Sequence, residues 1–272
     1  MPTISPEPLP TTAGEVHKQR QVAESFGANV ERYDRTRPRY PDAMVERIVA
    51  ESPGPDVLDV GIGTGIAARQ FRAAGCRVRG VEPDSRMAEF ARRSGFEVEV
   101  SKFETWEPDG RTFDAVIAGQ TWHWVDPVAG AAKARQVLRP NGVLAVFWNG
   151  AQPPMELAER FAEVYTRLVP DSPFGRTWLR PVADAYKAMS AAAEEGIREA
   201  GGFAEPRKWR VHWEQTYTRE EWLDQVPTMG GHNLLDAALL AELLTGLGAA
   251  VDAVGGAFPM GYSTEVLVAS SA

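Results

Sequence analysis

A short apolar run followed at once by spaced glycines places the strongest constraint on the fold. Residues 57–60 read Val-Leu-Asp-Val, and Gly61, Gly63 and Gly65 follow before the apolar spacing of a helix begins. A strand, a tight turn and a helix in this order are typical of the first unit of a parallel α/β sheet. Glycine is needed where a ligand lies against the backbone or where the turn takes positive φ. The same pattern also occurs in ordinary strand-to-helix turns, so it does not by itself identify a site.

The rest of the chain continues this alternation of strands and helices. Several helices begin at a capping residue: Asp84, Asp126 before Pro127, and Thr218 paired with Glu221. The expected strands are residues 56–60, 77–82, 98–101, 113–119, 143–148, 209–217 and 264–269. The other expected helices are residues 43–50, 66–74, about 156–168, about 184–200 and about 234–254. The alternation predicts an α/β fold with a doubly wound, mostly parallel sheet of seven strands.

Length and composition predict one domain. The 272 residues are 44% hydrophobic, which is enough to bury one large core. Residues 1–20 are rich in Pro, Thr and Glu without an apolar period and are expected to form a poorly ordered tail. Residues 21–272 are expected to form a single domain. Within it, residues 26–150 would bind the cofactor, and residues 151–272 would add the substrate-side helices, a helical cap and the last two strands.

Charge and cysteine content exclude several classes of function. A net charge of −8 opposes binding to phosphate backbones, so we expect a small-molecule partner and no nucleic acid. No apolar run reaches the roughly 18 residues that a membrane span needs, and the first residues lack the pattern of a signal peptide, so we expect a cytoplasmic protein. Cys76 is the single cysteine, and the histidines are not spaced as a metal site. We therefore expect no metal.

A second acidic residue limits the classes of ligand that this turn could bind. Glu82 closes the second expected strand, 21 residues beyond Gly61, where a carboxylate can accept both hydroxyls of an adenosine ribose. Nicotinamide enzymes and methyltransferases share this arrangement. The glycines here are spaced Gly-x-Gly-x-Gly, and Ile66 holds the position of the third glycine in the dinucleotide fingerprint. The spacing favours S-adenosylmethionine, which has no pyrophosphate for a helix N-terminus to bind.

Five segments in order resemble the class I S-adenosylmethionine-dependent methyltransferases of the type 11 group. They are VLDVGIGTG, GVEPD, the acidic SKFE, FDAVIAGQTWHWVDP and LRPNGVLAVFWN, within about residues 26–150. The stretch from Gln120 to Pro127 is similar to the subgroup that includes trans-aconitate methyltransferase. The resemblance implies a Rossmann-like sheet with an antiparallel last strand, S-adenosylmethionine as cofactor and S-adenosylhomocysteine as product.

The resemblance also implies cofactor-binding residues. Asp59, Gly61 and Gly63 would flank the methionine moiety, and Glu82 would bind the ribose. The remaining assignments are Met87 near the adenine, Phe103 and Glu104 at the adenine edge, and Gln120 at the methionine end.

The segment from Phe26 to Pro41 resembles the cofactor lid of this family. It holds four arginines within eight residues. Most such runs are solvated, and we expect one arginine, Arg37, to bind a carboxylate of the cofactor or of an acidic substrate. Tyr33 is expected to close over the methionine end.

His123 has two interpretations. It follows the fourth expected strand, where it could act as a general base, or it could accept a structural hydrogen bond and orient its two indole neighbours. Trp122 or Trp124 is expected to line the pocket while the other packs in the core, because adjacent residues face different ways. Trp222 and His232 are expected to contribute to the substrate side.

These observations predict transfer of a methyl group to a small, partly hydrophobic acceptor, with O-methylation slightly favoured over N, S or C methylation. Two alternatives stay open. One is a noncatalytic or non-methylating cofactor-binding module, and the other is a nicotinamide oxidoreductase. No sequence pattern identifies the acceptor or the oligomeric state, so both stay open.

Overall fold

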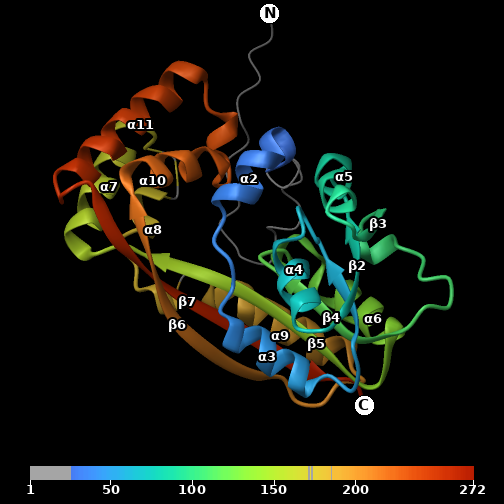
Figure 1. Ribbon diagram of the computed structural model, residues 1–272. Helices are drawn as coiled ribbons and strands as arrows, with labels where there is room; N and C mark the ends of the chain where they lie inside the picture. The colour runs from blue at the N-terminus through green and yellow to red at the C-terminus, as the bar shows by residue number, and fades with distance from the viewer. Residues whose placement is uncertain (1–25, 171, 173, 185) are drawn as a thin grey trace, which may run out of the picture.

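The computed structural model describes residues 26–170, 172, 174–184 and 186–272, so the expected tail of residues 1–20 lies outside the described residues. Seven strands form one sheet in the order β3-β2-β1-β4-β5-β7-β6 (Figure 1). They are β1 Asp56–Val60, β2 Arg77–Glu82, β3 Glu97–Val100, β4 Phe113–Gly119, β5 Leu138–Gln152, β6 Arg207–Thr218 and β7 Ala257–Ser270. Strand β7 runs antiparallel to β5 and β6, and the pairs among β1 to β5 are parallel. The predicted fold class is confirmed.

Helices cover both faces of the sheet. The described α-helices are α2 Val30–Thr36, α3 Asp42–Glu51, α4 Ile66–Ala73, α5 Ser85–Arg93, α6 Pro127–Val137, α7 Met155–Leu168, α8 Phe174–Thr177, α9 Lys187–Ala200, α10 Arg219–Gln225 and α11 Ala237–Asp252. One face packs on α3 and α4, and the other packs on α6 and α9. The predicted caps are present: Asp84 and Asp126 accept hydrogen bonds from the first turns of α5 and α6, and Thr218 forms a capping box with Glu221.

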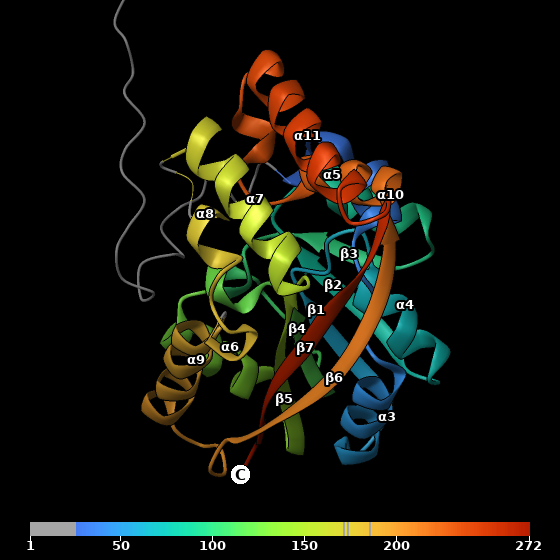
Figure 2. The ribbon, with the colours of Figure 1, turned by 90° about the vertical axis from the view of Figure 1, so that its left-hand side faces the viewer.

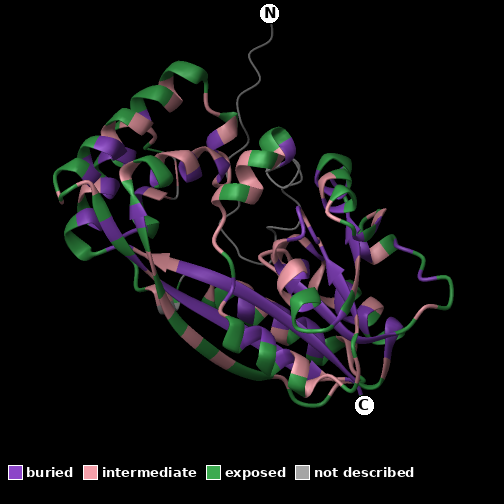
Figure 3. Cartoon of the chain, viewed as in Figure 1, coloured by how far each residue is buried: buried purple, intermediate pink, exposed green. Residues whose placement is uncertain are grey.

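The central strands are buried on both faces, as their continuous apolar sequences predict. The last four residues of β1 and the first six residues of β4 are buried (Figure 3). In register, Val60 lies beside Val81 of β2 and Asp59 lies beside Ile117 of β4. The carboxyl ends of β1, β2 and β4 therefore meet at one edge of the sheet, where ligands bind in folds of this kind.

Strands β5, β6 and β7 extend beyond the sheet core into a second cluster of apolar side chains. This cluster, which we call the cap core, is formed by α7, α10, α11 and the ends of β6 and β7 (Figures 1 and 2). The sequence predicted only the central part of β5 and the carboxyl-terminal part of β7, because Asn141, Gly142, Pro259 and Gly261 interrupt the apolar pattern. Within the described residues, no helix has the length and apolar character needed to cross a membrane.

Candidate active site

The glycine turn after β1 has one side fixed to the protein and one side open. Gly61, Gly63 and Gly65 all have positive φ, at 64°, 56° and 89°. Gly61 donates its amide to Val81 O at 2.8 Å, and a Cβ added there would collide with the side chain of Thr121. A Cβ added at Gly63 would meet only Gly61 O, at 3.9 Å. The turn thus leaves room above Gly63 for a ligand to lie against the backbone.

Glu82 lies beside this open space. Its carboxylate accepts the amide of Gly63 and the amide of Asp84, each at 2.9 Å, and the residue is 7% exposed. Burial raises the pKa of Glu82 to about 7, against the two backbone amides that favour the ionised form. Each carboxylate oxygen can accept a further hydrogen bond, so the group retains the capacity to bind a pair of ribose hydroxyls.

Asp59 supplies a second buried carboxylate next to the turn. It is 1% exposed, and its Oδ2 has no hydrogen-bond partner among the residues that the structure describes. Burial raises its pKa well above the usual value, and the charge of Glu82 adds to this effect. A buried acceptor without a donor is costly, so a ligand that brings a hydrogen-bond donor to this place is favoured. Together with the open face of Gly63, the two carboxylates fit a ligand with ribose hydroxyls and an ammonium group, such as S-adenosylmethionine.

The arginine-rich segment predicted as a lid forms helix α2, which lies between α10 and α5 at this edge of the sheet (Figure 1). Arg32 and Arg35 both bind Asp224 of α10, at 3.0 and 2.7 Å. Arg39 is exposed and donates to the backbone of Asp34. Arg32 and Arg35 thus attach α2 to α10, and Arg39 bonds within its own segment.

Arg37 differs from the other three because it points inward. It donates to the carbonyl of Thr228 and lies 4.8 Å from the centre of the Tyr33 ring. The charge of Arg37 also lowers the pKa of five buried groups. Burial raises the pKa of four of them, Tyr40, Tyr186, Tyr217 and Tyr262, and lowers the pKa of the fifth, His232. The structure thus places Arg37 beside Tyr33 and Thr228, where its charge reaches the cap core, and its ligand stays a prediction.

Gln120 begins the loop after β4 in a left-handed conformation, with φ of 57°. Its side chain donates to Asn149 O at 3.2 Å, and its hydrogen bond to Tyr186 opposes the rise in the Tyr186 pKa that burial causes. Asn149 in turn accepts from Thr264 at 2.6 Å and donates to Arg39 O at 3.2 Å. Sequence analysis missed Tyr186 and Asn149, because their neighbours come from distant parts of the chain.

His123 is held by an indole. Trp148 Nε1 donates to His123 Nδ1 at 3.2 Å, and burial lowers the pKa of the imidazole to about 4. A neutral ring whose Nδ1 accepts a hydrogen bond carries its proton on Nε2, so it presents a donor and not a base. The hydrogen bond favours the orienting interpretation. Of its neighbours, Trp122 is buried in the core and Trp124 is half-buried.

The other predicted residues are distributed around this edge. Met87 is buried on α5, and Phe103 is buried against Trp122 just after β3. Glu104 accepts the amide of Asp126 at 3.0 Å, which ties the loop after β3 to the start of α6. Their expected contacts with adenine stay predictions.

The two cap residues lie deep in the cap core. Trp222 is 1% exposed and stacks on Phe161, with ring centres 5.6 Å apart. His232 is buried, its Nε2 lies 2.7 Å from the Tyr165 hydroxyl, and burial lowers its pKa to about 4. Both rings are therefore uncharged hydrogen-bonding groups in an aromatic surrounding.

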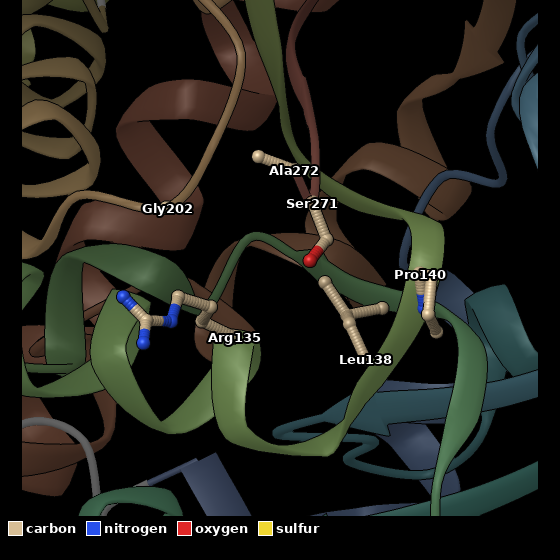
Figure 4. Close-up of a pocket in the computed structure, with 6 residues that line it drawn as sticks. All are labelled: Arg135, Leu138, Pro140, Gly202, Ser271 and Ala272. Carbon is tan, nitrogen blue, oxygen red and sulfur yellow. The ribbon is translucent and has the colours of Figure 1, made fainter.

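A separate pocket of about 420 Å³ lies at the opposite end of the sheet (Figure 4). It is lined by Arg135, Leu138, Pro140, Gly202, Ser271 and Ala272, at the start of β5 and beyond the end of β7. Because the glycine turn follows the carboxyl end of β1, this pocket does not belong to the site. The described part of the chain contains no cluster of three or more side chains suited to bind a metal ion.

Part of the chain is similar to a known protein family. Residues 58–146, from β1 into β5, match the family model described as a methyltransferase domain. The glycine turn, Asp59 and Glu82 all lie within this matched region, so the part of the chain that carries them is similar to methyltransferase domains.

Two proteins of similar sequence are also named as methyltransferases. An uncharacterized methyltransferase of Mycobacterium tuberculosis is 34% identical over 134 residues, which cover 48% of this chain and 54% of the relative. A ubiquinone biosynthesis O-methyltransferase of Methylocella silvestris is 29% identical over 170 residues, covering 58% and 66%. The chain thus spans about half the length of the mycobacterial relative. The solved structure of a putative type II methyltransferase from Anaeromyxobacter dehalogenans has a TM-score of 0.61 at 24% identity, covers 85% of this chain and 97% of its own, and shows the same fold.

Proposed function

We propose that this protein transfers a methyl group from S-adenosylmethionine to a small, partly hydrophobic acceptor. The observation that carries the proposal is the open face of Gly63 flanked by two buried carboxylates, Asp59 and Glu82. The hydroxyls and the ammonium group of the cofactor complement these acceptors, and the Gly-x-Gly-x-Gly spacing of the turn departs from the dinucleotide fingerprint.

When bound, the cofactor supplies an electrophilic methyl group on its sulfonium. The residues of the chain would hold it: Glu82 binds the ribose, and Asp59, Gln120 and Tyr33 surround the methionine end. Met87, Phe103 and Glu104 form the adenine side, and Arg37 binds a carboxylate. Helix α2 excludes water, so that an acceptor held in line reacts through proximity.

The acceptor would lie between α2 and the cap, near Trp222 and His232, with Trp122 supporting the wall from the core. The aromatic surrounding favours an apolar acceptor, and neutral His123 would orient the wall or polarise the nucleophile through its Nε2–H. O-methylation is the favoured outcome. The sequence from Gln120 to Pro127 supports a position near the trans-aconitate methyltransferase subgroup.

The test measures two quantities on the full chain. Titration with S-adenosylhomocysteine and with NADH reports which cofactor binds, and methyl-labelled S-adenosylmethionine with a panel of small phenols, acids and amines reports transfer. Binding of S-adenosylhomocysteine with label in a product supports the proposal. Binding without transfer to any acceptor would favour a noncatalytic module, and preferential binding of NADH would favour an oxidoreductase.

A further inference from the structure

Helix α10 carries two buried polar atoms that the protein leaves without partners. Trp222 Nε1 is a donor and Gln225 Oε1 is an acceptor, and the two residues are 1% and 3% exposed. Neither atom has a hydrogen bond to any described residue. Because the residues are three positions apart on a helix, their side chains leave the same face of α10, with Cβ atoms about 5–6 Å apart.

The surroundings connect this pair to the acceptor side of the site. Arg37 donates to Thr228 O, and the Thr228 hydroxyl donates to Gln225 O at 2.7 Å. The Gln225 side chain also hydrogen-bonds Tyr262, whose hydroxyl lies 2.7 Å from that of Tyr217. Gln225 therefore belongs to a polar network that links Arg37 to the cap core, and Trp222 packs beside this network against Tyr217.

The chemistry of the two atoms selects one kind of group. A carboxylate cannot donate to Gln225 Oε1, and an ammonium group cannot accept from Trp222 Nε1. A hydroxyl does both, since it donates one hydrogen bond and accepts another. An amide oxygen is too weak a base to take a proton, so a hydroxyl held here is not the atom that receives the methyl group.

Resting on the methyltransferase function proposed above, we propose that the acceptor carries a hydroxyl group, distinct from the methylated atom, that binds between Trp222 Nε1 and Gln225 Oε1. We call these two atoms the hydroxyl subsite. A site built to hydrogen-bond a substrate hydroxyl discriminates strongly against an analogue without it, because its own buried polar atoms then stay unpaired. The subsite would thus set acceptor specificity and leave cofactor binding unaffected.

The test uses three matched probes on protein saturated with S-adenosylhomocysteine: phenol, anisole and toluene. Wild type should bind phenol about tenfold or more tightly than the other two. Trp222→Phe and Gln225→Leu should each reduce this preference to a few-fold or less. Trp209→Phe removes an equally unpartnered indole on β6, and Gln136→Leu removes an exposed amide on α6, so both controls should retain the preference.

Affinity for S-adenosylhomocysteine gives an independent readout, since Trp222→Phe and Gln225→Leu should both bind it as wild type does. Equal binding of the three probes by wild type, or an unchanged preference in Trp222→Phe and Gln225→Leu, would overturn the inference. Failure of wild type to bind S-adenosylhomocysteine would instead contradict the proposed function.

Discussion

At the scale of single residues, the Glu82 carboxylate has a structural role, and we propose that it also binds the ribose of the cofactor. It fixes the glycine turn through Gly63 and the start of α5 through Asp84. The residue therefore cannot be removed without leaving two backbone amides short of an acceptor, and a conservative substitution is the informative one.

We expect Glu82→Gln to weaken S-adenosylhomocysteine binding about tenfold to hundredfold, because one charge-assisted acceptor of the ribose is lost. Titration calorimetry measures the change. Glu265→Gln is the matched control, since Glu265 is also 7% exposed but binds Arg210 on β6. Unchanged affinity in Glu82→Gln would contradict the ribose assignment.

The raised pKa of Glu82 adds a pH dependence. Its value of about 7 lies above the ordinary 4.5, so the free protein binds a proton that the unfolded chain releases. The contribution to stability is complete below 4.5 and is lost as the pH rises through 7. Ribose hydroxyls prefer the ionised form, so cofactor affinity should fall by up to about tenfold per pH unit below 7. The same titration from pH 5.5 to 8.5 should give a shallower profile for Glu82→Gln, in which Asp59, whose pKa burial also raises, is the remaining acidic group.

His123 separates a proton-transfer role from an orienting one. If the hydrogen bond from Trp148 defines its role, His123→Asn should retain most of the rate, and His123→Ala should lower stability by about 1 kcal/mol. Rate against pH for wild type and His123→Asn is the measurement. A loss of about 10²-fold or more, with an acidic limb that disappears in the Asn variant, would instead identify a general base.

At the scale of elements, α2 is attached to the cap by a shared carboxylate. The ion pairs of Arg32 and Arg35 with Asp224 are partly exposed, so each adds little to overall stability. Their effect should be on the closed position of the lid.

We expect Asp224→Asn to change the melting temperature by no more than a few degrees while accelerating S-adenosylhomocysteine release several-fold. Stopped-flow displacement measures the dissociation rate. Asp252→Asn breaks a comparable ion pair, with Arg219, away from the lid and should leave the rate as in wild type. Equal rates in all three proteins would show that α2 does not gate the cofactor.

Elements specified by local patterns were predicted closely. The bounds of β1, β2 and β4 agree with the structure because turn residues lie on both sides of each strand, and β1 and β4 are also largely apolar. Helix α2 was not predicted as a helix, since its arginines and acids show no apolar stripe, and it is held by Asp224 nearly 190 residues away. Tyr186 and Asn149 were not predicted because their partners are also far away in the sequence. Glu82 and the glycine turn were predicted because their spacing in the sequence is short.

At the scale of the whole molecule, β7 joins the cores. Val266 and Val268 pack on one face of the sheet and Leu267 on the other, while Phe258 and Met260 belong to the cap core. A single strand that serves three clusters couples their stabilities.

We therefore expect residues 21–272 to unfold as one cooperative unit, as the single-domain prediction requires. Calorimetry should give one transition with equal calorimetric and van't Hoff enthalpies. Saturation with S-adenosylhomocysteine at about 100 times its dissociation constant should shift the whole transition, since it adds roughly 2.7 kcal/mol. Two transitions, of which only one moves with the ligand, would show that the cap and the cofactor core are separate units.

The position of β7 also affects synthesis of the chain. Among the described strands, β6 pairs with β7 alone. Strand β7 also pairs with the edge of β5 that does not face β4. Until residues 257–270 emerge from the ribosome, both strands present unpaired amides and carbonyls next to apolar side chains. The nascent protein consequently passes through a stage in which two open edges are exposed to aggregation, and holding chaperones would act at that stage.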